Sequence, residues 1–266
     1  MSFETIRKGS LEYLISTIIP MPHCFTTRYG GVSEGHLGSL NLGRSRGDDP
    51  ERVFENYRIL GDAVGFDVDN LVFTRQVHGD VVVTVGKADC KANNCQDIPV
   101  EGRDGLVTGE RDVALTVFSA DCTTILLCDS VQEVVAAVHS GWRGTALGIV
   151  KRAVEKMQQE FSCRPEDICA AIGPCIGRCC FETHRDVPDA MLAALGVDAL
   201  PAIDQISERP EKFFVDLKLL NEIWLRKAGV TQIDVCPDCT ACQPERFWSH
   251  RRVGNQRGSM AAIITR

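Results

Sequence analysis

Two side chains of the kind that bind metals, a cysteine and a histidine, follow two apolar runs near the middle of the chain. The first run, Val113–Ala120, leads to Cys122, and the second run, Val134–Val138, leads to His139. The runs are apolar with almost no polar alternation, which is typical of strands buried on both faces. Because functional groups are often carried on loops held by a rigid scaffold, we expect Cys122 and His139 to form part of a metal site.

A further histidine, His78, also follows an apolar run. It follows the strand-like run Leu71–Val77 and precedes a glycine. With Cys122 and His139 it makes an N, N, S set suited to catalytic zinc, which uses three protein ligands and keeps a fourth position open. Sequence distance does not prove that the three converge, and each one alone is more often an ordinary core residue. Arg143 would then place a positive charge beside the metal.

Other segments carry weaker chemical signals. The cysteines of CPDCTAC, residues 236–242, resemble half of a zinc-ribbon knuckle, but no second pair follows at ribbon spacing, so structural zinc is the less favoured interpretation. Residues 173–182 predict a glycine-rich turn into a helix, whose N-terminus could receive an anion, although turn chemistry alone explains the glycines. Arg251 and Arg252 follow aromatic residues and suit an anionic or planar ligand, or a solvated turn. Arginines and glycines of residues 25–50 could line a polar pocket.

Helices and further strands would hold these residues in place. Asp49 and Pro50 predict a helix start, as N-cap and first helical residue. Apolar residues at intervals of three and four predict a second helix over 146–161, and Asp216 would cap another over 217–228. Further strands are expected over 81–85, 168–172, 231–235 and 260–265, with a polar loop over 87–101. This alternation of short strands with four amphipathic helices predicts a mixed α/β or α+β fold.

Composition narrows the class of protein. The chain has 266 residues and no recognisable linker, so we favour a single domain over residues 1–266. Its net charge of −7 argues against a nucleic-acid-coating surface. No apolar stretch reaches the roughly 18 residues of a membrane helix, so we expect no membrane span, no signal peptide and a cytoplasmic location. The 13 cysteines are then expected to be mostly reduced.

Several segments match a known family in the family's order, from about residue 24 to the C-terminus. They include TRYGGVSEGHLGSLNLG, QVHGDVV, VALTVFSADCTTILLCD, VAAVHSGWRGTALGIV, AAIGPCIGRCCFE and FWSHRRVGNQRGSMAAI. On these the chain resembles the YfiH/laccase-domain family, historically called multicopper polyphenol oxidases and now regarded as purine nucleoside phosphorylases that also deaminate adenosine. Ser140 and Phe181 depart from the commoner Ala and Tyr. The cysteine-rich stretches 175–180 and 236–242 exceed the family's usual content, which leaves a redox or accessory-metal role open.

The resemblance implies an α+β single domain of packed mixed β-sheets flanked by helices, with the site at strand ends. It implies a metal bound by His78, Cys122 and His139, normally Zn²⁺, with Cu²⁺ as the alternative. The substrates would be phosphate and a purine nucleoside: adenosine, inosine, guanosine or methylthioadenosine. The products would be the free base and ribose 1-phosphate, and adenosine would also be deaminated to inosine.

Roles for individual residues follow from this expected chemistry. Cationic groups must hold phosphate and stabilise the charge that develops as the glycosidic bond breaks, and Arg143 is the first candidate. The weaker candidates are Arg28, Arg251 and Arg252. Asn41 is a candidate for contact with the ribose. For deamination, an open zinc site lowers the pKa of water to about 7, and Asp121 is the first candidate for the proton carrier, with Asp104 second.

Three other functions remain open on the residues alone. Cys122 could act as a nucleophile with His139 as its base, as in a cysteine hydrolase. A copper-dependent polyphenol oxidase agrees with the older family name, but several coppers need many histidines and the chain has six. A zinc-binding regulatory protein would leave no open coordination position. The sequence does not indicate an oligomeric state.

Overall fold

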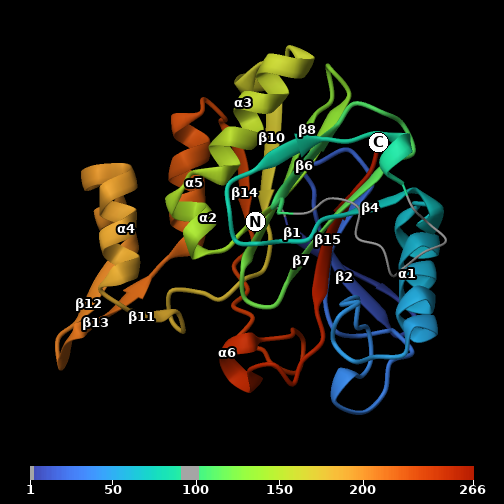
Figure 1. Cartoon of the computed structure of the whole chain (residues 1–266), viewed down its shortest axis with the longest axis horizontal. Coiled ribbons are helices and arrows are strands. Elements are labelled where there is room, and N and C mark those ends of the chain that lie inside the picture. Colours follow the sequence, from blue (N-terminus) through green and yellow to red (C-terminus); the bar gives the residue numbers. More distant parts are fainter. Residues whose placement is uncertain (1–2, 91–101) are drawn as a thin grey trace.

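The computed structural model describes residues 3–90 and 102–266, and its fold is α+β, as predicted. Two six-stranded mixed sheets pack face to face, helices cover their outer faces, and a small third sheet lies at one end (Figure 1). The polar loop predicted over 87–101 lies, beyond Cys90, outside the described residues. No helix in the described ranges has the length and apolar character needed to cross a membrane.

The first sheet carries the N-terminal strands and the closing strand. Its order is β1 (Phe3–Lys8), β2 (Leu11–Ser16), β3 (His23–Thr26), β15 (Met260–Ile264), β7 (Ala114–Ser119) and β4 (Leu71–Phe73). Along β7, Leu115 and Val117 face the core between the two sheets, whereas Ala114 and Phe118 face the outer side. Helix α1 (Pro50–Val64) packs on that outer side, so β7 is buried on both faces, as its sequence predicts.

The second sheet carries the strands that lead to the site. Its order is β14 (Gln232–Val235), β10 (Ile168–Ile172), β8 (Thr123–Asp129), β9 (Val134–Ser140), β6 (Gly105–Thr108) and β5 (Val82–Thr84). The two edge pairs, β10–β14 and β5–β6, are parallel, and the inner pairs are antiparallel. Helices α3 (Ile149–Phe161) and α5 (Leu217–Lys227) cover the face turned away from the first sheet.

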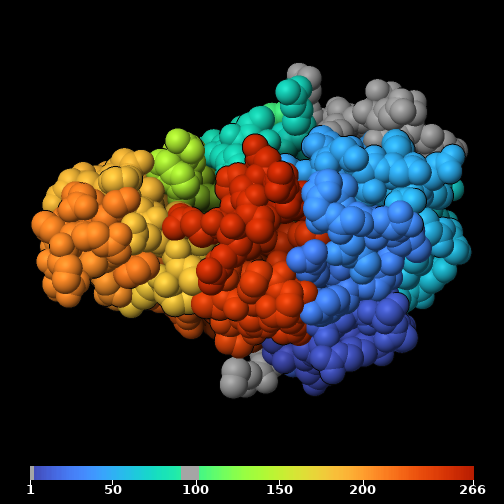
Figure 2. Space-filling model, turned by 90° about the horizontal axis from the view of Figure 1, so that it is seen from below, coloured from blue at the N-terminus to red at the C-terminus, as the bar shows by residue number. Residues whose placement is uncertain are grey.

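The third sheet forms a separate layer with its own small core. It contains β11 (Glu182–His184), β13 (Arg209–Val215) and β12 (Ile203–Ile206), against which α4 (Asp186–Leu195) packs. Figure 2 shows this part in orange and yellow, projecting at one end, with the C-terminal segment in red between it and the N-terminal half. Two short helices, α2 (Trp142–Ala146) and α6 (His250–Val253), lie beside the site.

Helix ends agree with the sequence where side-chain caps were expected. The Asp49 side chain accepts a hydrogen bond from the Glu51 N–H at 2.9 Å, and that of Asp216 accepts one from the Leu219 N–H at 3.1 Å. The helix predicted over 146–161 is wrong at its start, because the chain breaks between α2 and α3. There Gly148 has a left-handed φ of 71°, and Leu147 is 50% exposed instead of belonging to the apolar stripe.

Three strand-level predictions also need correction. Residues 173–182 turn into strand β11 and not into a helix, so no helix N-terminus is presented there. The run Leu71–Val77 forms a strand only as far as Phe73, because the chain then turns at residues whose N–H groups bond to a buried carboxylate. No strand was predicted between the apolar runs that lead to Cys122 and His139, but β8 lies there along the chain, with β7 in one sheet and β9 in the other.

Candidate metal centre

The structure brings His78, Cys122 and His139 together although they come from three different places in the fold. One ligand atom from each lies within 4.8 Å of the others, and the two imidazole rings are 4.8 Å apart at 77°. Cys122 directly precedes β8, where the chain crosses from the first sheet to the second. His139 lies within β9, paired with Thr124 of β8, and His78 occupies the turn between β4 and β5.

A buried carboxylate, Asp104, organises two of these three residues. It accepts a hydrogen bond from His139 Nδ1 at 2.7 Å and from the backbone N–H of His78 at 3.0 Å. It also accepts from the N–H groups of Val77 and Gly79, at 3.1 and 2.9 Å, and so holds His78 in a left-handed conformation, with φ of 59°. Because Nδ1 of His139 is engaged, its Nε2 is the nitrogen left for a metal, as in carboxylate–histidine–zinc triads.

Glycines in HSGWRG allow the chain to approach the ligands closely. A Cβ atom on Gly141 would lie 2.5 Å from Nδ1 of His78 and 3.5 Å from the sulfur of Cys122. A Cβ atom on Gly144 would lie 2.9 Å from the carbonyl oxygen of Gly79. Only a residue without a side chain leaves the histidine ring in place at position 141.

The acid–base properties of the ligands suit metal binding. Burial raises the pKa of Cys122, but the charge and hydrogen bonds of His139, followed by those of His78, lower it to about 6. Burial lowers the pKa of His139, but the Cys122 thiolate and Asp104 together raise it to about 9. Burial raises the pKa of Asp104, but its hydrogen bond with His139 and those from backbone N–H groups lower it by more. The pKa of Asp104 is therefore below its ordinary value. A thiolate at neutral pH is the form of cysteine that ligates zinc, so the donor set fits a three-ligand metal.

A cavity of about 240 Å³ opens on one side of the ligands and is rich in arginine. Its lining includes Arg44, Arg46, Arg75, Gln76, Phe73, Phe118, Arg257 and Ser259. Burial lowers the pKa of Arg257 to about 10, and the like charge of Arg46 adds to this effect. Neither of these two arginines forms an ion pair with a carboxylate in the described part of the chain, where Nε of Arg257 also has no hydrogen-bond partner. Two guanidinium groups in this arrangement favour a bound anion.

A second cavity of about 340 Å³ lies on the other side and has the aromatic side chains Trp142 and Phe181 in its lining. Its lining includes Trp142, Arg143, Ile176, Phe181, Leu217, His250 and Arg251. The two cavities share His78, Cys122 and Arg257. The candidate metal ligands therefore lie between a cavity lined by four arginines and a cavity lined by Trp142 and Phe181.

Two of the predicted substrate residues line the second cavity. The Arg143 guanidinium stacks on the ring of Trp142, 4.2 Å from its centroid. Arg251 donates through Nη1 to the carbonyl oxygens of Cys180 at 3.0 Å and Glu182 at 3.1 Å.

The other three predicted substrate residues do not line either cavity. Arg252 donates through Nε to the carbonyl oxygen of Ala241 at 2.5 Å, and Arg28 stacks on Trp248 at 3.7 Å. Asn41 is fully buried, and its Oδ1 accepts hydrogen bonds from the Gly43 and Ser259 N–H groups at 2.9 and 3.0 Å. These contacts with the backbone and with Trp248 suit residues that support the structure around the cavities.

Asp121 supports a wall of the second cavity. Its carboxylate accepts hydrogen bonds from Thr240 Oγ1 at 2.6 Å, Ser249 Oγ at 3.1 Å and the Arg251 N–H at 2.6 Å. Its φ of 95° is left-handed, so these bonds hold an unfavourable backbone conformation. A carboxylate with three donors is suited to positioning a loop more than to carrying a proton.

Sequence reasoning missed the arginines of the first cavity. Arg44 and Arg46 belong to the Gly- and Arg-rich segment that was expected to line a polar pocket, and this general signal pointed in the right direction. Arg257 lies in a short loop before β15 and carries no local signal. It reaches the site only because β15 pairs with β7, whose end leads to Cys122.

Comparisons with known proteins identify the family of this chain. Residues 22–266 match a family model described as multi-copper polyphenol oxidoreductase laccase. YlmD of Geobacillus stearothermophilus, named a purine nucleoside phosphorylase, is 38% identical, and the match covers 91% of this chain and 88% of YlmD. The crystal structure of YlmD superposes with a TM-score of 0.91 at 35% identity and covers 98% of each chain. LACC1 of Mus musculus, also named a purine nucleoside phosphorylase, is 33% identical; the match covers 97% of this chain but 59% of LACC1.

Proposed function

The chain belongs to the multi-copper polyphenol oxidoreductase laccase family, and from this premise we propose that it is a zinc-dependent purine nucleoside phosphorylase. Its substrates would be phosphate and adenosine, inosine, guanosine or methylthioadenosine, and its products the free purine and the ribose 1-phosphate. The observation that carries the proposal is the position of His78, Cys122 and His139 between an arginine-rich cavity and a cavity lined by Trp142 and Phe181. Relatives that bear the name purine nucleoside phosphorylase support the same assignment.

The two cavities suggest where each substrate part binds. Neither Arg46 nor Arg257 forms an ion pair within the described ranges, so a phosphate dianion in the first cavity would relieve their mutual repulsion and accept bidentate hydrogen bonds. Trp142 and Phe181 give the second cavity flat apolar surfaces suited to a purine ring. Arg143, on the ring of Trp142, would lie beside the base and not beside phosphate, contrary to the first role considered for it.

Phosphorolysis breaks the glycosidic bond and forms a bond between a phosphate oxygen and the anomeric carbon. The electron pair of the broken bond leaves with the purine, which must take up a proton at a ring nitrogen. Zinc held by His78, Cys122 and His139 would supply Lewis-acid stabilisation of negative charge. Asp104 orients His139, and Asp121 holds the wall that carries Arg251.

His250 is our candidate for the proton source. It lines the second cavity, and its Nδ1–H donates to the carbonyl oxygen of Gly254 at 3.1 Å, so Nε2 would transfer a proton to the purine from the doubly protonated ring and leave the neutral ring behind. Asp121, by contrast, is a positioning residue in this proposal. Deamination of adenosine is a second reaction of the same site, because a zinc centre with an open position can also activate water.

Turnover by purified, zinc-loaded protein tests the proposal. Adenosine, inosine, guanosine and methylthioadenosine would be incubated with and without phosphate, and base, ribose 1-phosphate and ammonia followed by chromatography. We expect phosphate-dependent release of base, its loss in a folded His78→Ala variant, and at least a tenfold higher KM for phosphate in Arg257→Gln. Arg58→Gln, on the exposed face of α1, is the matched control and should behave as wild type. If neither base nor ammonia is released from any nucleoside, the proposal fails.

A cysteine hydrolase is the second candidate, because Cys122, His139 and Asp104 follow the order of nucleophile, base and orienting acid. The hydrogen bond from His78 to the sulfur of Cys122 argues against a hydrolase, because a nucleophile with its base does not need a second histidine. Alkylation of Cys122 with and without zinc separates the two. Protection by zinc supports ligation, whereas zinc-independent alkylation together with ester turnover supports the hydrolase.

A further inference from the structure

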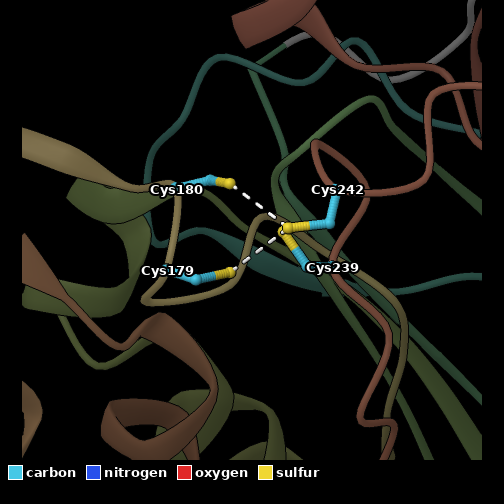
Figure 3. A group of neighbouring side chains, drawn as sticks. All are labelled: Cys179, Cys180, Cys239 and Cys242. Atoms are coloured by element: carbon cyan, nitrogen blue, oxygen red, sulfur yellow. Dashed lines mark hydrogen bonds between the residues drawn. The ribbon is translucent and has the colours of Figure 1, made fainter.

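A second group of metal-binding side chains lies outside the site described above. Cys179 and Cys180 follow β10, and Cys239 and Cys242 follow β14. The two strands are parallel neighbours, so the segments that leave them emerge at the same edge of the second sheet. There a bridge between Cys175 and Cys239 continues the pairing, and all four sulfur atoms lie within 4.8 Å of one another (Figure 3).

The spacing of the sulfur atoms fits a tetrahedral metal better than disulfides. Zinc–sulfur bonds of about 2.3 Å place tetrahedral sulfur ligands about 3.8 Å apart. Sγ of Cys242 lies 3.5 Å from that of Cys179 and 3.4 Å from that of Cys180, and all are free thiols. Adjacent cysteines also suit a disulfide poorly, since their Cα atoms are about 3.8 Å apart and disulfides usually span about 4.4–6.8 Å.

The backbone closes over the cluster at a glycine. The N–H of Gly177 donates to the sulfur of Cys239 at 3.1 Å, a contact that favours the thiolate a metal requires. A Cβ atom on Gly177 would lie 3.2 Å from Cβ of Cys239 and 3.3 Å from the sulfur of Cys179. The turn can approach the four sulfur atoms this closely because position 177 has no side chain.

The apolar contact between these two segments is small. Among the residues that the structure describes, their shared apolar core has Ile176, Cys239 and Ala241 as its only buried members, with Cys180 and Phe181 packed against it. Such a small core contributes little burial energy, and small cores of this kind are commonly stapled by a structural metal.

We propose that Cys179, Cys180, Cys239 and Cys242 bind one zinc ion as a tetrathiolate structural site. Four thiols lose four protons on binding, so the four thiolates and Zn²⁺ carry a net charge of −2. A soft set of four sulfur ligands selects zinc over magnesium or calcium, and it leaves no open position for substrate. In a zinc ribbon the second pair of ligands lies at a fixed distance along the sequence. Here the second pair, Cys179 and Cys180, is on the segment that follows the neighbouring strand β10.

This site would stabilise one wall of the second cavity. Thr240, between two of the cysteines, donates to Asp121, and Arg251 donates to the carbonyl oxygen of Cys180. Phe181, which follows Cys180, lines the cavity together with Arg251. The tetrathiolate site would therefore set the position of residues on the purine side, whether or not the reaction is phosphorolysis.

Zinc content measured in the wild type and three variants tests the proposal. Protein expressed with zinc and purified under reducing conditions would be dialysed and analysed by plasma mass spectrometry. We expect two zinc ions per wild-type chain, one in His78→Ala and one in the Cys179→Ser/Cys242→Ser double variant. Cys169→Ser, which removes a partly exposed thiol of β10 outside the cluster, is the matched control and should keep two.

Cobalt gives an independent readout of the ligands. Cobalt(II) loaded into His78→Ala should show the visible absorption of a tetrahedral tetrathiolate complex, and the double cysteine variant should not show it. A content of one zinc per wild-type chain that falls to zero in His78→Ala would overturn the proposal. Because that variant leaves all four cysteines in place, the test holds even if the double variant fails to fold.

Discussion

Replacement of Asp104 by Asn separates the orientation of the metal ligands from their identity. The carboxylate accepts four hydrogen bonds, two on each oxygen: His139 Nδ1 and the His78 N–H on one, the Val77 and Gly79 N–H groups on the other. An amide keeps one acceptor oxygen and puts an NH₂ group against two donors in either orientation. Hydrogen bonds to charged groups contribute about 1.5–3 kcal/mol each, so loss of two removes about 3–6 kcal/mol locally.

Part of this loss should appear as weaker metal binding. Substitutions of residues that orient ligands typically lower metal affinity about 10- to 100-fold, which corresponds to about 1.4–2.7 kcal/mol. Competition with a chromophoric zinc chelator measures the affinity, and chemical denaturation of the metal-free protein measures the remaining effect on the free energy of unfolding. All three ligands stay in place in this variant, so the affinity change reports their orientation together with the loss of the Asp104 charge that raises the pKa of His139.

Asp129→Asn is the matched control. Asp129 is also a fully buried aspartate, and its Oδ1 accepts hydrogen bonds from the Val131 and Gln132 N–H groups at 2.8 and 3.0 Å. It lies at the end of β8 opposite Cys122, so its substitution should lower stability without changing zinc affinity. Wild-type zinc affinity in Asp104→Asn, or an equal loss in both variants, would refute the reasoning.

Two further variants test separate contacts. In Gly141→Ala the new methyl group would meet Nδ1 of His78 at 2.5 Å, so zinc affinity should fall at least tenfold in the chelator assay; Gly79→Ala, whose nearest contacts would be ordinary at 3.6 and 3.7 Å, should retain it. In Glu12→Gln a buried ion pair with Arg246 at 2.6 Å is lost. Burial raises the pKa of Glu12, but Arg246 and a second arginine lower it by more, so the pKa lies below its ordinary 4.5. The pair therefore stabilises the fold above pH 4.5, and this stabilisation is lost as the pH falls through the folded-state pKa. Denaturation should therefore show a deficit of roughly 2 kcal/mol at neutral pH that disappears in acid, and a deficit independent of pH would contradict the pairing.

Elements whose signals are local were predictable from the sequence. Helix α1 begins at Pro50 behind the Asp49 cap, α5 begins behind Asp216, and β7 is buried on both faces. The break between α2 and α3 was not predictable, because Leu147 continues the apolar pattern of the helix. The helix is interrupted at Gly148, whose φ is left-handed. Strand β8 was missed, and with it the crossing of the chain from the first sheet to the second, because strand order has no local signature.

The site was predictable in its residue types and not in its assembly. His78, Cys122 and His139 each follow or end an apolar run, a signal visible in one dimension. Arg46 and Arg257 meet in one cavity only because β15 lies beside β7 in the first sheet, and strand order of this kind has no local signature. For the same reason, residue types alone suggested Arg143 for phosphate, whereas its stacking on a Trp ring places it with the aromatic cavity.

The two clusters of metal-binding side chains are linked through one residue. Asp121 directly precedes the ligand Cys122, and its carboxylate accepts a hydrogen bond from Thr240, which stands between Cys239 and Cys242. The carbonyl oxygen of Asp121 also accepts one from the N–H of Ile176, close to the other two cysteines. The left-handed backbone at Asp121 is unfavourable by itself, so it depends on these contacts to place the sulfur of Cys122. Greater mobility of the cysteine-rich loops would therefore shift the sulfur of Cys122 through the backbone of Asp121. It would change the geometry of the candidate catalytic metal site without a substitution of any of its three ligands.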